Sequence, residues 1–286
     1  MAMSVITVTG GAGNLGRQVV RLLLERGYQV RLFDLPELDY DFAAGQPGLE
    51  VVPGDLRDQA ALTQACARAE WVVHLAAIMP PLSETQPELA RTVNIEGTQA
   101  LLAAMPAEAK LVLASSVATY GVAQTGVVGL DHPQRPIDFY GQTKIQNEKD
   151  VLASGRAAVI LRISGISVPA LLEIPRPWFF TRDQKVEFVH LWDAALAVAN
   201  CIGNDAAIGR TWQIAGGETW RTTGQGYSDA ICAAFDTPPE DATYRDTPNW
   251  PAWFDTAASQ VCLNYQKHTF EDFTGELRQI YQEAIA

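Results

Sequence analysis

The chain has few cysteines and few histidines, and neither residue type forms a cluster. Its four cysteines are Cys66, Cys201, Cys232 and Cys262, which lie far apart and form no CxxC pair. The spacings typical of zinc and redox sites are therefore missing, and we expect no protein-bound metal. Each cysteine lies in an apolar, helix-like stretch, which indicates buried free thiols in a reducing compartment.

The sequence also lacks a long apolar run and an excess of positive charge. No run approaches the roughly 18 residues of a membrane span, and residues 1–4 lead into an apolar strand pattern instead of a basic leader. Asp and Glu number 33 against 21 Lys and Arg, for a formal net charge of -12. Because nucleic acid and anionic membranes bind basic surfaces, we expect neither as a partner. We predict a cytoplasmic protein that acts on a small molecule.

What the sequence does contain is a regular alternation of strand and helix patterns. Short apolar or β-branched runs occur at 4–9, 29–34, 49–52, 71–75, 110–115 and 157–163. Segments with helical periodicity lie between them, near 14–26, 57–68, 86–105 and 139–153. This alternation predicts an α/β fold with a Rossmann-type, doubly wound parallel sheet.

The alternation ends near residue 165, where a more irregular region begins. We expect a dinucleotide-binding core over 1–165, to which 186–215 returns with a helix and a strand. The segments 166–185 and 216–286 are predicted to form a small, irregular C-terminal substrate-binding subdomain. Its tryptophans either pack this subdomain or line a substrate cleft.

Three glycines follow the first predicted strand with the spacing of a nucleotide-binding turn. In Gly10-x-x-Gly13-x-x-Gly16, the first allows a tight turn, the second lets a pyrophosphate approach, and the third lets helix and strand pack closely. Asp34 ends the second predicted strand, where a carboxylate binds the adenosine ribose and repels a 2′-phosphate. This favours NAD over NADP, whereas the alternative is that Asp34 only caps a turn.

A tyrosine and a lysine lie four residues apart in the helix predicted over 139–153. Tyr140 titrates near 10 when free, too high for a base at neutral pH, and the Lys144 ammonium stabilises its phenolate. Ser115 and Ser116 end a predicted strand, and ligands bind at the carboxyl ends of parallel strands. A serine hydroxyl there can hold a reacting oxygen toward the tyrosine.

Further short motifs occur in a fixed order along the chain. They are Gly54-Asp55-Leu56, His74-Leu75-Ala76-Ala77, Asn94 within Val-Asn-x-x-Gly-Thr, Tyr120-Gly121 after the serines, Arg162-Ile163, and Phe188-Val189-His190-Leu191-Trp192-Asp193. Together with the glycine turn, these motifs resemble the extended short-chain dehydrogenase/reductases, specifically the NAD-dependent epimerase/dehydratase family. The resemblance covers most of the chain and implies an NAD-dependent oxidoreductase.

The resemblance also implies roles for individual residues. Tyr140 would be the general acid or base, Lys144 would lower its pKa and bind the nicotinamide ribose, and Ser116 would polarise the substrate oxygen. Alignment on Tyr120 and Gly121 favours Ser116 over Ser115. The cofactor-binding residues would be Gly10, Gly13, Asn14, Leu15, Gly16, Asp34, Asp55, Leu56, Leu75, Ala76, Ala77, Asn94, Tyr140, Lys144 and Ile163.

Two departures from the family pattern reduce the number of reactions that the resemblance leaves open. Val117 and Ala118 stand where dehydratases of the family carry an Asp-Glu pair, so dehydration is disfavoured. Only 26 positions separate Arg162 from Phe188, which resembles small members such as uronate dehydrogenases more than nucleotide-sugar epimerases. Arg176 would then bind a substrate carboxylate, unless it is an exposed loop arginine. The predicted substrate residues are Ile78, Met79, Ser116, Val117, Ser164, Arg176 and Trp178.

The leading hypothesis is an NAD-dependent dehydrogenase of a small, polar, sugar-like secondary alcohol. An alternative is an epimerase of a sugar or nucleotide sugar that keeps NAD bound. A hypothesis of another class is a non-catalytic NAD-sensing protein, which the complete Ser/Tyr/Lys set disfavours. The family resemblance implies a homodimer in which the helices near 86–105 and 139–153 pair across a two-fold axis.

Overall fold

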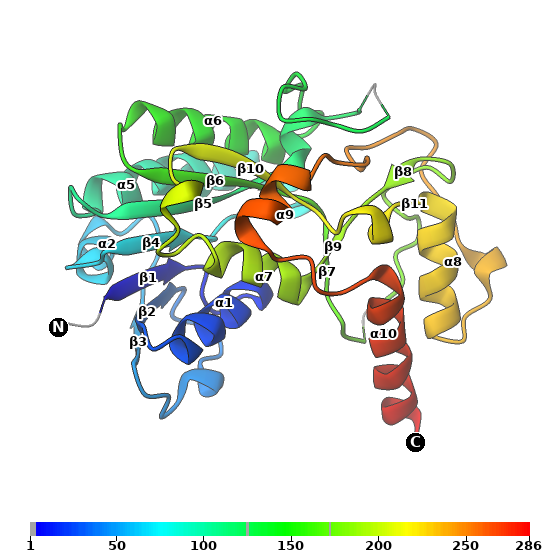
Figure 1. Cartoon of the computed structure of the whole chain (residues 1–286), viewed down its shortest axis with the longest axis horizontal. Coiled ribbons are helices and arrows are strands. Elements are labelled where there is room, and N and C mark those ends of the chain that lie inside the picture. The colour runs from blue at the N-terminus through cyan, green and yellow to red at the C-terminus, as the bar shows by residue number, and fades with distance from the viewer. Residues whose placement is uncertain (1–3, 124–125, 172) are drawn as a thin grey trace.

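A parallel sheet of seven strands forms the centre of the protein, as the computed structural model shows (Figure 1). The structure describes residues 4–123, 126–171 and 173–286. The strand order is β10-β6-β5-β4-β1-β2-β3. The strands are β1 (Val5–Thr9), β2 (Gln29–Asp34), β3 (Leu49–Pro53), β4 (Trp71–His74), β5 (Lys110–Ser116), β6 (Ala158–Ile163) and β10 (Arg210–Ile214). The predicted Rossmann-type fold is thereby confirmed.

Helices cover both faces of this sheet because its strands are apolar on both sides. On one face, α1 (Asn14–Glu25) and α7 (Leu191–Ala199) pack over the core that contains Val112 and Ala114. On the other face, α2 (Gln59–Cys66), α5 (Gly97–Ala104) and α6 (Phe139–Ala153) pack over Leu111 and Leu113. Successive side chains of β5 therefore pack into the cores on opposite faces of the sheet, because side chains alternate between the two faces of a strand.

The helix predicted over 86–105 is interrupted. It is divided into α4 (Pro87–Ala90), a π-helical turn over Arg91–Glu96 and α5. The short helix α3 (Leu82–Thr85) precedes them. Single π-turns are frequent at functional sites, and this one places Asn94 against the segment that follows β4.

The C-terminal region is built from short strands and helices around an aromatic core. Its elements are β7 (Ile166–Ser167), β8 (Lys185–Val186), β9 (Val189–His190), β11 (Thr222–Thr223), α8 (Gly224–Ala234), α9 (Ala257–Leu263) and α10 (Phe270–Ile285). Helices α8 and α10 lie side by side, away from β1 and β2 (Figure 1). The helix α7 and the strand β10 are the helix and strand expected where 186–215 returns to the sheet.

No helix within the described ranges combines the length and apolar character that crossing a bilayer requires. All four cysteines carry free thiols, and Cys66, Cys201 and Cys232 are buried.

A buried histidine joins β4 to β1 and α5. His74 Nδ1 lies 2.7 Å from Thr9 Oγ1, and its Nε2 lies 2.9 Å from Thr98 Oγ1. Thr98 donates its own proton to the Asn94 carbonyl, so its oxygen accepts from His74 Nε2 and Thr9 donates to Nδ1. Burial lowers the pKa of His74 to about 3, so the ring is neutral.

This neutral histidine predicts a loss of stability in acid. The unfolded chain protonates His74 near pH 6.5 and the folded chain near pH 3, so between these values the unfolded state binds more protons. The free energy of unfolding should therefore fall with decreasing pH by up to about 1.4 kcal/mol per pH unit from this residue alone. Urea titrations from pH 7 to 4 should show this slope reduced in His74→Gln, and an unchanged slope would contradict the assignment.

Candidate active site

The glycine turn lies where the sheet's strand order reverses, between β1 and β4. Gly10 has a φ of 73°, which favours glycine. A side chain at Gly10 would lie 2.6 Å from the Ala76 amide nitrogen, and one at Gly16 would collide with the Gly10 carbonyl. The turn is therefore packed tightly against both the start of α1 and the segment after β4.

The start of α1 is open to an anion. A Cβ at Gly13 would meet only the Gly10 oxygen, at 3.5 Å, and Gly13 and Asn14 are exposed. Gly13 is the N-cap residue, and no side chain caps the helix. The first amide groups of α1, including those of Asn14 and Leu15, are thus available to a phosphate. This arrangement fits the pyrophosphate of a dinucleotide.

Asp34 extends from the end of β2 to the same turn. Its Oδ2 accepts a hydrogen bond from the Ala12 amide at 3.0 Å, and its Oδ1 accepts from the Leu35 amide at 2.9 Å. A carboxylate has about four acceptor positions, so lone pairs remain for ribose hydroxyls. The capping role and the ribose-binding role are therefore compatible.

The other predicted cofactor residues differ in what they contact. Leu75, Ala76 and Ala77 follow β4 at the carboxyl edge and are half-buried. Asp55 is bound to Arg57, whose hydrogen bond lowers the pKa of the Asp55 carboxyl, and Leu56 packs against α5.

Asn94 is buried and already has hydrogen-bond partners within the protein. Its Oδ1 accepts from the Ile78 amide at 2.7 Å, and its Nδ2 donates to the Ile78 carbonyl at 2.9 Å and to Thr143 Oγ1 at 3.2 Å. Asn94 thus fixes the segment after β4, a positioning role that leaves little of its amide for a ligand.

The predicted catalytic residues come together at the carboxyl end of β5. The Ser116 hydroxyl lies beside the Tyr140 phenol, where it lowers the pKa of that phenol against the larger, opposing effect of burial. Ser115 instead donates to Glu148 Oε1 at 2.5 Å in the buried interior. The structure therefore places Ser116, and not its neighbour, beside the tyrosine, in agreement with the alignment on Tyr120.

Lys144 lies one turn beyond Tyr140 on α6 and is almost completely buried. Its Nζ donates to the Ala114 carbonyl at 2.8 Å and lies 5.6 Å from the centroid of the Tyr140 ring. Burial lowers the pKa of Lys144 to about 8, an effect that the charge of Glu148 opposes. Burial, with the nearby Asp138 carboxylate, raises the pKa of Tyr140. The tyrosine can act as a base only when further positive charge approaches.

Behind these residues is a buried ion pair that we did not predict from the sequence. Arg162 donates to both oxygens of Glu148, at 3.0 and 2.7 Å, and to the Tyr120 hydroxyl at 2.9 Å. Gln134 and Ser115 also donate to Glu148. The one available signal was that Glu148 lies four residues after Lys144, on the same face of the helix.

A second unpredicted carboxylate holds the first turn of α6. Glu84 accepts hydrogen bonds from the Phe139 amide at 2.9 Å and from the Tyr140 amide at 3.1 Å. Asp138 caps the same helix by accepting from the Gly141 amide at 2.7 Å. Carboxylates are favourable at a helix N-terminus, and Glu84 thereby connects α3 to the turn of α6 that carries Tyr140.

The predicted substrate residues are only partly brought together. Ile163 pairs with Ser116 across β5 and β6, and the buried Ser164 hydroxyl that follows has no partner among the described residues. Arg176 is 57% exposed and lies 3.8 Å from Asp241 on the surface. Its environment matches that of an exposed loop arginine.

Trp178 is buried in the aromatic core of the C-terminal region. Its ring stacks on Phe180 with a centroid distance of 5.4 Å and lies edge-on to Tyr227. This position agrees with the packing interpretation of the tryptophan.

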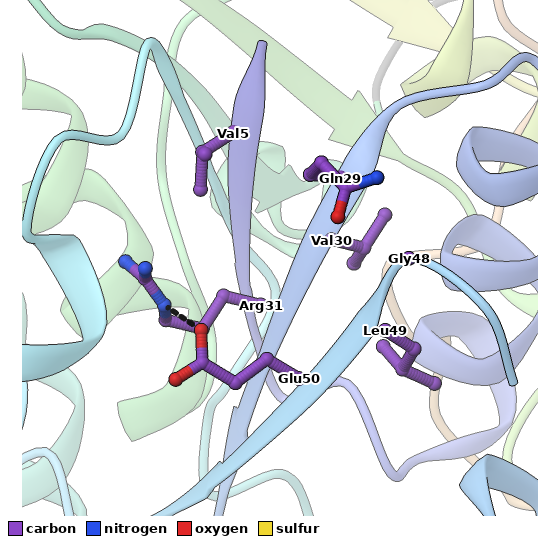
Figure 2. Close-up of a pocket in the computed structure, with 7 residues that line it drawn as sticks. All are labelled: Val5, Gln29, Val30, Arg31, Gly48, Leu49 and Glu50. Carbon is purple, nitrogen blue, oxygen red and sulfur yellow. Dashed lines mark hydrogen bonds and ion pairs between the residues drawn. The ribbon is translucent and has the colours of Figure 1, made fainter. Parts of the chain in front are cut away.

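Two other features of the described residues lie apart from this site. His190, Asp193 and His268 are close together, but the Asp193 carboxylate already accepts hydrogen bonds from the Lys267 and His268 amides and from the His268 ring. A pocket of about 220 Å³, lined by residues such as Arg31 and Glu50, lies at the amino ends of β1, β2 and β3 (Figure 2). It is at the opposite edge of the sheet from the catalytic residues.

The sequence profile of the NAD dependent epimerase/dehydratase family matches residues 6–169. This range contains the glycine turn, the serine, the tyrosine and the lysine described above. The chain belongs to this family. This match confirms the family that the short sequence motifs indicated.

Individual members of the family show moderate similarity to this chain. Sterol-4-alpha-carboxylate 3-dehydrogenase, decarboxylating, from Mus musculus is 36% identical over 151 residues, 51% of this chain and 40% of that protein. UDP-glucose 4-epimerase from Streptomyces lividans is 35% identical over 169 residues, 57% of this chain and 50% of that protein. The chain thus matches half or less of the length of these relatives.

A solved short-chain dehydrogenase/reductase superfamily protein from Agrobacterium tumefaciens, with bound NAD, shares the fold over nearly the whole chain. The TM-score is 0.82 at 22% identity, and the comparison covers 99% of this chain and 98% of that one. The same architecture therefore extends through the C-terminal region, beyond the range of the family profile.

Proposed function

We propose that the protein is an NAD-dependent oxidoreductase that interconverts a secondary alcohol and its carbonyl form. The observation that carries this proposal is the grouping of Ser116, Tyr140 and Lys144 beside an open glycine turn. When bound, NAD supplies a hydride acceptor at its nicotinamide ring. Gly10, Gly13 and Gly16 with Asp34 would hold its adenosine and pyrophosphate portion, and Ile163 would lie near the nicotinamide.

The chain's own residues move the proton. The Ser116 hydroxyl binds the substrate oxygen and directs it toward Tyr140. The Tyr140 phenolate takes the proton from the alcohol as the carbonyl forms, and the phenol returns it in the reverse direction. The Lys144 ammonium stabilises the phenolate by its charge. No acid–base pair for water elimination adjoins Ser116, because Val117 and Ala118 are apolar and buried.

The direct test is a screen of secondary alcohols for NADH formation at 340 nm with purified protein. Net NADH with at least one alcohol supports the dehydrogenase. Protein that retains NAD through purification and forms no net NADH while isomerising a sugar would instead indicate the epimerase. A protein that binds NAD but is unaffected in its biological role by Tyr140→Phe would indicate an NAD sensor.

Asp34 predicts the choice between the two nicotinamide dinucleotides. Replacing Asp34 with serine removes the charge that repels a 2′-phosphate and the acceptors for the ribose hydroxyls. We expect NAD to bind at least about tenfold more weakly, since a charged hydrogen bond contributes about 1.5–3 kcal/mol, and NADP to bind more tightly. Calorimetric titration of both dinucleotides checks this. Equal losses of affinity for NAD and for NADP would contradict the proposed role of Asp34.

We also propose a cytoplasmic homodimer. Four free cysteines are consistent with a reducing compartment. Helices α5 and α6 lie side by side, joined by the hydrogen bond from Gln99 to Asp150, and together they would form the surface that pairs with a second copy. Sedimentation equilibrium tests the dimer, and a monomer at all concentrations would overturn it.

A further inference from the structure

Three stretches that follow strands beside Ser116, Tyr140 and Lys144 contain no charged residue. They are residues 78–82 after β4, the first part of the connection after β5 (117–123), and 164–171 after β6. In a doubly wound sheet, the ligand lies among the segments at this edge. The surroundings of the reacting oxygen are therefore built mainly from uncharged, largely apolar side chains.

Most polar groups in these segments are already paired. Thr119 donates to the Ser116 carbonyl at 2.8 Å, the Tyr120 hydroxyl accepts from Arg162, and Ser167 is paired with the Tyr227 hydroxyl at 2.9 Å. The Ser164 hydroxyl is the one buried side-chain group of these segments that lacks a partner among the described residues. Few hydrogen-bonding groups are thus left for a substrate with many hydroxyls.

Large apolar side chains are exposed around the start of α6. Met79 is 62% exposed, Ile137 is 49% exposed, and Leu82 and Val122 are also exposed. Leu82 begins α3, which Glu84 ties to Tyr140. A Cβ at Gly121, the residue before Val122, would lie 3.4 Å from Ile137 Cγ2. These exposed side chains thus belong to segments that adjoin the turn carrying Tyr140.

Two aromatic rings lie next to Gly165, the residue that follows Ser164. A side chain at Gly165 would lie 2.6 Å from the Phe188 ring and 3.1 Å from the Trp250 ring. The nearest neighbours of a Cβ at Gly165 are therefore two packed rings. Both rings belong to the aromatic core of the C-terminal region.

We infer that the substrate is a secondary alcohol carried on an apolar body, and not a polyhydroxylated sugar. The inference rests on the proposed function and replaces the sugar-like substrate predicted from the sequence. A polyol that entered these surroundings would leave hydroxyls without partners, and sites strongly reject such ligands. An apolar body would gain binding free energy from each methylene removed from water.

A matched series of cyclic alcohols tests this directly. The probes are cyclohexanol, 4-methylcyclohexanol and 4-tert-butylcyclohexanol, compared with myo-inositol, which has the same ring with a hydroxyl on every carbon. We expect kcat/KM to rise by about fourfold for each added buried carbon, and myo-inositol to be at least about 100-fold poorer than cyclohexanol. A preference for myo-inositol or for aldoses over the alkylated alcohols would overturn the inference while leaving the proposed function in place.

A binding measurement separates failure of the inference from failure of the proposed function. Calorimetric titration with 4-tert-butylcyclohexanol and with myo-inositol, in the presence of NAD, needs no turnover. Binding of the apolar alcohol alone supports the inference even if no alcohol in the panel is oxidised. Tighter binding of myo-inositol, or binding of neither probe, overturns it.

Variants of the exposed apolar residues provide the matched control. Met79→Gln and Ile137→Gln should each raise KM for 4-tert-butylcyclohexanol by about fivefold to tenfold, because the probe loses apolar contact, with little change in kcat. Val261→Gln, at an 88% exposed position in α9, should change neither value. Equal effects of all three variants, or no effect of any, would contradict the placement of the apolar body.

Discussion

Replacing Tyr140 with phenylalanine is expected to lower kcat by roughly 100- to 10,000-fold, the range in which a positioned acid or base contributes. The variant removes one oxygen, that of the phenol beside Ser116 which we propose takes the proton. The binding of NAD should change little, since the glycine turn and Asp34 are untouched. Stopped assays at 340 nm and calorimetric titration of NAD measure the two quantities separately.

The matched control is Tyr281→Phe, which removes the same oxygen from α10, far along the chain from the site. This variant should retain the full rate. Ser116→Ala should lower kcat as well, because the hydroxyl that holds the substrate oxygen is lost. A Tyr140→Phe enzyme with near-normal kcat would refute the assigned role, whatever the substrate.

Replacing Arg162 with leucine is expected to destabilise the folded protein by about 3–5 kcal/mol, the loss seen when one partner of a buried ion pair is removed. Glu148 would keep its charge in the interior with only the hydrogen bonds from Ser115 and Gln134. The Tyr120 hydroxyl would also lose a donor. Chemical denaturation measures the loss as a lower midpoint at an unchanged slope.

The control for Arg162 is Arg91→Leu, which breaks the surface pairs with Glu88 and Glu96. Exposed pairs contribute little, so the change should stay within about 1 kcal/mol. The double variant Arg162→Met/Glu148→Leu removes both charges and should recover part of the loss. Equal losses in the free energy of unfolding for Arg162→Leu and Arg91→Leu would show that the buried pair stabilises the protein no more than a surface pair does.

The sequence was most informative where a residue's role depends on local periodicity. The central strands and α6 could be predicted almost to their ends because apolar residues recur at the periods of strands and helices. The glycine turn, and the placement of Tyr140 and Lys144 one turn apart on a helix, also follow from spacing. Each of these features is defined within a few positions of the chain.

Features that depend on distant partners could not be predicted in this way. The motif at Tyr120 and Gly121 favours Ser116 over Ser115, but no local pattern reveals that Ser115 donates to Glu148, a residue 33 positions away. The role of Glu84 depends on the hydrogen bond that it accepts from the Phe139 amide of α6, 55 positions further along the chain. The interruption of the helix near Asn94 arises from its contacts with Ile78, which the helical pattern does not reveal.

The two hydrogen bonds that Glu84 accepts from α6 also limit how this enzyme can be altered. Residues 78–82, which we propose to face the substrate, run directly into α3, the short helix that carries this carboxylate. A design that shifts the segment to admit a new substrate will also displace the amide of Tyr140. Engineers should therefore expect substrate range and turnover to change together unless the hydrogen bonds of Glu84 are preserved.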